Sequence, residues 1–261
     1  MKRIILSFII ILLWSISYGQ RKYFDEYEVN AGYSIFQGDF GERGDFSTTL
    51  GNNGFLIGGK AFLVLLDYNR PNCYGCKHLK FPLIFNVGYS TLGYDKAYND
   101  VDVITPDLRK LKALSGSIFQ SQVNFGIEYH LGDLNAISFS GNAFLEKFDP
   151  FVGVSAGITA YVDNLTSTLG DIDSEPDIIP SALKDGIYNK PGVAPTFMIE
   201  GGFRYKISNR MAISLNSRWM YYFSDKVDGI KPNSSAKNLY NDWQFSPSVG
   251  VVFLLRNSGF Y

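Results

Sequence analysis

Apolar and polar residues alternate one by one along three stretches of the chain, residues 26–39, 120–131 and 243–255. Successive side chains of a β-strand point to opposite faces, so this alternation predicts strands with one apolar and one polar face. A weaker form of the same pattern marks five further segments. They are Phe55–Leu66, Phe81–Tyr94, Phe151–Val162, Thr196–Ile207 and Met211–Phe223. The pattern therefore predicts eight strands and an all-β fold.

The connections between the expected strands are unequal in length. Long polar segments follow the first, third, fifth and seventh strands, whereas Ser208–Arg210 is a tight turn. Transmembrane barrels alternate short periplasmic turns with longer external loops, and strands of roughly 9–11 residues suffice to cross the membrane. Two connections on the expected periplasmic side, 67–80 and 132–150, are also long. Ala136–Ser140 and Asn142–Leu145 could extend the flanking strands or add a hairpin there, so ten strands is an alternative to eight. A helical period is confined to Pro106–Ser115.

The N-terminal segment has the layout of a secretory signal peptide. A basic pair at residues 2–3 precedes the apolar run Ile4–Ile16, and Ser17–Gly19 supplies small residues for cleavage. The run is shorter than the roughly 20 residues that a membrane-spanning helix needs. We therefore expect residues 1–19 to be a signal peptide and residues 20–261 to form an exported barrel in the bacterial outer membrane.

Alternation alone does not separate a membrane barrel from a soluble one, because the two differ only in which face points outward. Here the polar faces are rich in Gly, Asn, Ser and Gln rather than Lys or Asp, which suits a crowded interior. Aromatic residues reach 16% of the chain and gather at strand ends, as in Tyr221–Phe223, where membrane barrels carry interfacial girdles. The sequence thus predicts a transmembrane antiparallel up-and-down β-barrel surrounded by outer-membrane lipids. The net charge of −1 argues against a nucleic-acid surface.

Charged side chains also occur on the polar faces of the expected strands. They are Lys60, Glu128, Glu200, Arg204 and Arg218. An eight-stranded barrel is just wide enough inside for side chains, and buried charges must pair with one another. We therefore expect a structural polar network that closes the lumen. The alternative is a polar site or narrow conduction path.

Cys73 and Cys76 are the only cysteines of the chain and fall on an expected periplasmic connection. In an oxidising compartment their default state is a disulfide. His78 and His130, the only histidines, are expected at the same rim, so a Cys₂His₂ metal site is the alternative. The disulfide is the favoured interpretation, and no metal or cofactor is predicted.

The expected third external loop, 163–195, is acidic. Asp171–Glu175 resembles the first half of a calcium loop, but Pro176 stands where that loop needs glycine. We interpret the loop as a solvated acidic surface. Both histidines map to the opposite rim, away from any serine or acid at the outer rim that would need one as a base. We therefore predict no catalytic residues.

Several segments carry a resemblance to a known family. They are Gly38-Asp39, Phe148–Gly153 with Ala156-Gly157, Tyr205–Arg210, and Arg218–Asp225. In these the chain resembles the small outer-membrane barrels of Bacteroidota, including the PorG-type component of the type IX secretion system. The resemblance implies an eight-stranded barrel in the outer membrane. With the plugged lumen and the lack of a catalytic constellation, we expect a non-catalytic structural component of an envelope machine, with type IX protein secretion as the machine. Its partners would be periplasmic or outer-membrane proteins of a secretion complex. The alternative function is a small passive channel or conduit for small hydrophobic or polar solutes, similar to OmpW.

Overall fold

A computed structural model describes residues 24–40, 50–63, 78–94, 105–132, 147–184, 186–231 and 241–255. Within these ranges the chain forms eight strands, one α-helix and two short 3-10 turns. The strands are β1 (Phe24–Gln37), β2 (Asn53–Leu63), β3 (Leu79–Gly93), β4 (Leu114–His130), β5 (Phe148–Ser167), β6 (Gly192–Ser208), β7 (Met211–Tyr222) and β8 (Trp243–Leu254). The helix is α3 (Pro106–Ala113), and the 3-10 turns are η4 (Pro176–Ile178) and η5 (Ser181–Leu183).

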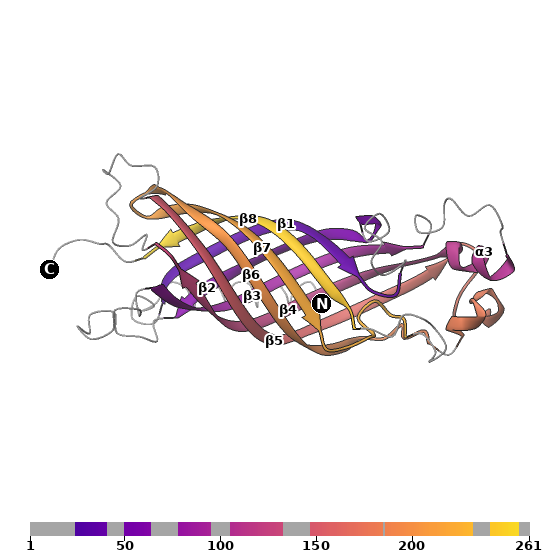
Figure 1. Cartoon of the computed structure of the whole chain (residues 1–261). Helices are drawn as coiled ribbons and strands as arrows, with labels where there is room; N and C mark the ends of the chain where they lie inside the picture. The colour runs from indigo at the N-terminus through magenta and orange to yellow at the C-terminus, as the bar shows by residue number, and fades with distance from the viewer. Residues whose placement is uncertain are drawn as a thin grey trace, which may run out of the picture.

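The strands form one closed antiparallel barrel in which every strand pairs with its sequence neighbour and β8 pairs with β1 (Figure 1). The closure has a defined register, because Ala31 of β1 lies opposite both Ile57 of β2 and Val249 of β8. The predicted up-and-down barrel of eight strands is confirmed. Residues 136–145, on which a ten-stranded barrel would depend, lie outside the described ranges.

The barrel wall is apolar on the outside and polar on the inside. Val152, Val193 and Trp219 point outward and are 63%, 65% and 53% exposed, whereas inward-facing Glu128 is fully buried. A soluble barrel has the opposite arrangement. A continuous outward apolar band around a closed sheet is the surface of a transmembrane barrel.

In the described ranges, no helix combines the length and the apolar character that crossing a membrane requires.

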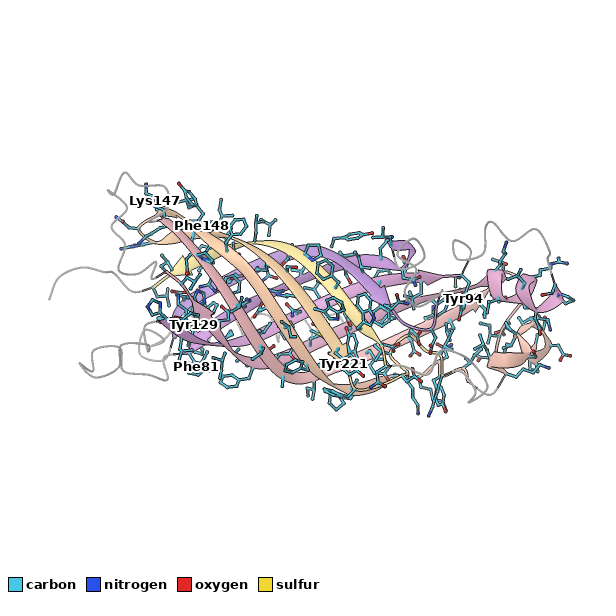
Figure 2. The ribbon with its side chains drawn as sticks, viewed as in Figure 1. Phe81, Tyr94, Tyr129, Lys147, Phe148 and Tyr221 are labelled. Atoms are coloured by element: carbon cyan, nitrogen blue, oxygen red, sulfur yellow. The ribbon has the colours of Figure 1, made fainter. Side chains whose placement is uncertain are left out.

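Aromatic side chains gather toward both ends of this apolar band. Phe81, Tyr129 and Phe148 lie near the end where β1 begins, and Tyr221 lies toward the other end (Figure 2). Neighbouring rings pack on each other across strands, as in Trp219 with Trp243, whose centroids are 4.9 Å apart. Such girdles place amphipathic rings at the two membrane–water interfaces.

Three strands are several residues longer than the sequence predicts, and one of them is β6, which begins at Gly192 rather than Thr196. β4 begins at Leu114 rather than Gln120, and β5 runs from Phe148 to Ser167 rather than from 151 to 162. The expectation that Asp163 lies in a loop is therefore wrong. The reason is that β4 and β5 keep pairing beyond the apolar band, where polar residues replace apolar ones and Ser115 Oγ lies 3.0 Å from Thr166 Oγ1.

The longer connections lie at the end of the barrel that carries α3 (Figure 1). Helix α3 confirms the helical period around Pro106, and its N-cap Thr105 accepts a hydrogen bond from the Leu108 amide at 3.2 Å. Transmembrane barrels place their longer loops outside the cell. We therefore call this end the outer mouth, and the end where β1 starts and β8 finishes the periplasmic rim.

Candidate functional site: a polar core inside the barrel

The five charged residues singled out in the sequence all point into the barrel and are buried. Lys60 of β2 lies at their centre. Its Nζ donates hydrogen bonds of 2.7 Å to Glu128 of β4 and of 2.7 Å to Glu200 of β6. One ammonium group thus joins three strands across the lumen, which the closed barrel allows because the opposite walls are within reach of a lysine side chain.

Arg204 of β6 is the most connected cation of this core. Its guanidinium donates to Glu26 of β1 at 2.8 Å and to Glu128 at 3.2 Å. It also lies 3.7 Å from Glu28 and stacks 4.5 Å above the centroid of the Phe62 ring. The planar guanidinium offers five N–H donors in a fixed fork and a flat face that stacks on an aromatic ring, so it suits a site shared by several carboxylates.

Arg218 of β7 connects the charged residues to a neighbouring set of amides. Its guanidinium donates to Glu200 at 3.4 Å and to Asn30 Oδ1 at 3.0 Å. Glu28 in turn accepts a hydrogen bond of 2.7 Å from Asn216. The sequence places Glu200 and Arg204 on one strand face, but the two are not partners: each pairs with residues of other strands.

Further members were not assigned to this network in the sequence, although His130 was considered there as a metal ligand. They are Glu26, Glu28, Lys80, His130 and Asp149. Glu26 and Glu28 lie on the inward face that the alternation itself defines, so the strand pattern could have found them. Lys80 and Asp149 lie outside the predicted strand bounds, so their orientation followed only from the longer strands of the structure.

His130 lies between two carboxylates at the periplasmic end of the network. Its Nδ1 is 2.8 Å from Asp149 and its Nε2 is 2.8 Å from Glu128. A neutral imidazole has one donor and one acceptor nitrogen, so two carboxylate contacts require one further proton, on the ring or on a carboxyl group. The acids joined by the ion pairs are Glu26, Glu28, Glu128, Glu200 and Asp149, and the bases are Lys60, Lys80, His130, Arg204 and Arg218.

Uncharged polar side chains fill the next layer toward the outer mouth. The Tyr222 hydroxyl lies 2.6 Å from Gln120 Oε1, and Gln120 Nε2 donates to Gln244 at 2.7 Å. Gln122 joins the same cluster from β4, 3.3 Å from Gln244. These side chains come from β4, β7 and β8, so hydrogen bonds cross the lumen here as ion pairs do in the layer below.

An apolar layer closes the barrel above the amides. Phe36 and Ile118 are fully buried and belong to one cluster that continues into the outer connections through Ile179 and Ile230. The Phe36 ring also packs on Tyr222, with centroids 5.8 Å apart. The lumen is therefore filled in three successive layers: ion pairs, amides and hydrocarbon.

Of the residues proposed for the disulfide or the alternative metal site, the structure describes only the two histidines. Cys73 and Cys76 lie outside the described ranges. His78 does lie beside His130, with its Nδ1 2.8 Å from the His130 carbonyl oxygen. Both ring nitrogens of His130, however, already contact carboxylates. Across the described residues, no group of three or more metal-ligating side chains is arranged to hold a metal ion.

The acidic segment of the third outer connection forms a turn. Asp171 Oδ1 accepts the Asp173 amide at 3.1 Å and Asp171 Oδ2 accepts the Ser174 hydroxyl at 3.0 Å. The carboxylate thus caps its own backbone in an Asx turn. Both aspartates are exposed, in agreement with a solvated surface.

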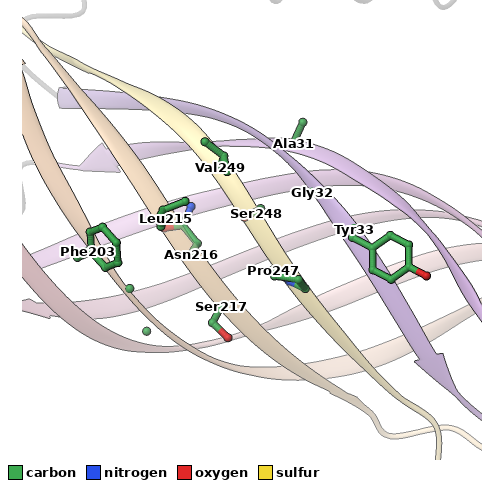
Figure 3. Close-up of a pocket in the computed structure, with 12 residues that line it drawn as sticks. Ala31, Gly32, Tyr33, Phe203, Leu215, Asn216, Ser217, Pro247, Ser248 and Val249 are labelled. Carbon is green, nitrogen blue, oxygen red and sulfur yellow. The ribbon is translucent and has the colours of Figure 1, made fainter. Parts of the chain in front are cut away.

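A shallow depression of about 460 Å³ lies on the outer wall between β1 and β6 (Figure 3). Small residues form its floor, and Tyr33 and Phe203 flank it. Pro247 lies in the same place and has no amide to donate, and the β1–β8 ladder shows no pairs for residues 33 and 34 opposite it. The depression faces the surrounding hydrocarbon rather than the lumen.

These features define the class of the protein: an eight-stranded transmembrane β-barrel with a filled polar core. No protein-family model matches the chain, and no curated protein matches it in sequence. Among solved structures it is similar to Neisserial surface protein A (10% identity, 88% of this chain and 96% of that chain, TM-score 0.44). It is also similar to a major outer membrane protein of Thermus thermophilus (11%, 87% and 98%, TM-score 0.42). A third is the outer membrane enzyme PagL (10%, 86% and 97%, TM-score 0.36). Likenesses at this level carry no information on function.

Proposed function

We propose that this protein is a non-catalytic β-barrel of the bacterial outer membrane that serves as a structural anchor for partner proteins of an envelope machine. The observation that supports this proposal is the filled lumen. Ion pairs around Lys60 and Arg204, amides around Tyr222 and hydrocarbon around Phe36 succeed one another along the barrel axis.

A filled lumen suits an anchor because it makes the barrel rigid and leaves no water-filled route. Each cross-lumen bond ties strands that are distant around the wall, as Lys60 of β2 does with Glu200 of β6. Deforming the barrel would break these bonds and leave buried charges without partners, which is costly. Passage of a solute would require the same rupture.

The absence of catalysis is part of the proposal. PagL is an outer membrane enzyme with a similar fold, so the fold alone does not decide whether this protein is catalytic. In the described ranges, both nitrogens of His130 contact carboxylates, and His78 lies at the same periplasmic rim. Neither histidine is therefore placed to activate a nucleophile at the outer mouth.

The partner machine is proposed from the family resemblance in the sequence. Its PorG-type members imply type IX protein secretion, with periplasmic or outer-membrane proteins of the secretion complex as partners. The apolar wall supplies the contact with outer-membrane lipids, and the long connections at both ends supply surface for proteins. The described outer connections carry α3 and the η4 and η5 turns.

Crosslinking in the native envelope tests the anchor role. A photoreactive amino acid at exposed Arg109 of α3 would report neighbours at the outer mouth, and one at outward Val152 of β5 would serve as the matched lipid-facing control. The proposal predicts defined protein adducts from position 109 and lipid adducts from position 152. A second probe at the periplasmic rim covers partners on that side. If neither probe gives a protein adduct, the proposal is contradicted.

The alternative function is a small passive channel or conduit. It predicts that solutes or ions cross the barrel, and so it is separated from the anchor by a conductance measurement on the purified protein.

A further inference from the structure

Five aspartates gather at the outer mouth, apart from the polar core. Asp39 follows β1, Asp163 lies near the outer end of β5, and Asp225, Asp228 and Asp242 belong to the connection between β7 and β8. Four of them are almost completely buried, with Asp163 at 4% and Asp242 at 0% exposed. This acidic cluster plays no part in the anchor role proposed above.

Backbone contacts bring the cluster together. The connection between β5 and β6 pairs with the one between β7 and β8, since the Tyr188 amide donates to the Gly229 carbonyl at 2.8 Å and the Lys231 amide donates to the Gly186 carbonyl at 2.6 Å. The Asp39 amide donates to Asp228 Oδ2, and the Ile230 amide donates to Asp228 Oδ1 at 2.9 Å. Both oxygens of Asp228 are thus used to shape the loop.

Glycines let the backbone approach the carboxylates closely. A Cβ on Gly229 would lie 2.5 Å from Asp163 Oδ2, and one on Gly38 would collide with Asp228 Oδ2. Gly229 also has a φ of +82°, which favours glycine. Asp163 of the barrel wall therefore faces directly onto the loop that carries Asp228.

The surroundings of Asp163, the aspartate on the barrel wall, point to a ligand. The Asp163 side chain is buried and neither of its oxygens accepts a hydrogen bond of good geometry; its nearest donors are the backbone amides of Asp163 itself and Lys190. Asp242 uses Oδ2 to accept the Val227 amide at 2.9 Å, but its buried Oδ1 has no partner either. Asp163 and Asp242 each lie within electrostatic reach of Asp228, and buried carboxylate oxygens without partners are costly unless a proton or a cation is present.

Protein cations do not supply the missing charge. No Lys, Arg or His of the described ranges lies within ion-pair distance of Asp163, Asp228 or Asp242. The Lys226 ammonium of the same loop lies 4.2 Å from the centroid of the Tyr188 ring instead. Burial, and then the neighbouring carboxylates, raise the pKa of Asp228 to about 7 and hold the pKa of Asp242 well above its ordinary value.

We propose that the acidic cluster binds a calcium ion, with Asp163 and Asp242 as its carboxylate ligands. Calcium takes oxygen ligands in flexible geometry and keeps water among them, and extracellular sites work at about 10⁻⁴–10⁻³ M. In the described ranges, no three His, Cys, Asp or Glu side chains are arranged to hold a metal ion by themselves. Water therefore completes the shell. The ion fastens the two paired outer connections to the barrel wall.

Terbium luminescence tests the site directly, because the ion replaces calcium and is excited through nearby tyrosines. The Tyr94 hydroxyl lies 2.6 Å from the Asp39 carbonyl oxygen, so a tyrosine stands beside the cluster. The protein folded in detergent micelles should show a saturable terbium signal that calcium displaces. The Asp163→Asn/Asp242→Asn variant should weaken binding at least tenfold. The control Asp171→Asn/Asp173→Asn, which removes the same charge from the exposed turn, should leave binding unchanged. Absence of a saturable signal, or equal losses in both variants, would overturn the proposal.

Hydrogen exchange supplies a second readout that does not depend on terbium. Calcium should slow exchange of the Val227 and Ile230 amides, which donate to cluster carboxylates, relative to exchange in EDTA. In EDTA the Asp163→Asn/Asp242→Asn variant should remain folded, as judged by its heat-sensitive electrophoretic mobility, because it no longer buries unpaired charge. Identical exchange of the wild-type amides in calcium and in EDTA would overturn the proposal.

Discussion

Arg204→Met is the substitution that tests the polar core most severely. The methionine keeps much of the side-chain volume and removes the guanidinium, which has no solvent exposure and lies 2.8 Å from Glu26, 3.2 Å from Glu128 and 3.7 Å from Glu28. Each carboxylate keeps at least one other partner, such as Lys80 for Glu26 and Lys60 for Glu128. The free energy of unfolding should therefore fall by about 3–5 kcal/mol, which is the cost of breaking one buried ion pair.

The assay is equilibrium unfolding in urea from lipid vesicles, followed by tryptophan fluorescence. Trp219 and Trp243 on β7 and β8 pack against each other and report on the wall. The control is Lys184→Met, which removes an ion pair of 3.2 Å with exposed Asp177 and should change stability by no more than about 1 kcal/mol.

A second variant separates ion pairing from packing. Adding Glu128→Gln to Arg204→Met removes a carboxylate that has lost its arginine partner, so the double variant should be more stable than the sum of the single losses predicts, by about 0.5–3 kcal/mol. If Arg204→Met costs less than about 1 kcal/mol, like the control, the charged core does not hold the barrel together and the reasoning fails.

Two further predictions concern the outer mouth and the pairing of β1 with β8, where the barrel closes. Because burial raises the pKa of Asp228 to about 7, above its unfolded value near 3.9, the folded protein holds protons that the unfolded chain releases. In EDTA, stability of the outer mouth should therefore fall as the pH rises from about 4 through 7, measured by exchange of the Ile230 amide corrected for intrinsic rates; a rise would contradict the assignment. Gly32→Ala should destabilise the barrel by about 1–3 kcal/mol in the urea assay, because its Cβ would collide with the Pro247 carbonyl oxygen. Gly201→Ala, whose nearest neighbour is 3.6 Å away, should be close to neutral, and equal losses would count against the close approach of β1 and β8.

The barrel could be predicted from the sequence because its signal is local. Alternation in residues 26–39 or 120–131 reports the strand and both of its faces at once. The outward direction also followed from composition, since Gly, Asn and Gln rather than Lys occupy the polar faces. What alternation does not reveal is where pairing stops. The β4–β5 pair continues through polar residues such as Ser115 and Thr166, which a search for apolar alternation passes over.

The polar core was predictable in only part of its membership, and its pairing was not predictable. Lys60 and Glu128 fall at inward positions of strands recognised in the sequence, yet their contact depends on the closure of the barrel. The acidic cluster had no periodic signal, because Asp228 and Asp242 come from a connection and Asp163 from an unpredicted extension of β5. Only the pairing of the outer connections brings these aspartates together.

The central claim is that ion pairs, amides and hydrocarbon close the lumen, and conductance through planar lipid bilayers tests it most directly. The purified barrel should insert without producing single-channel steps, while the Arg204→Met/Glu128→Gln variant, with two side chains of the charged layer shortened or neutralised, should show more leakage than the wild type. Reproducible single-channel steps from the wild-type protein would contradict the closed core and favour the passive channel.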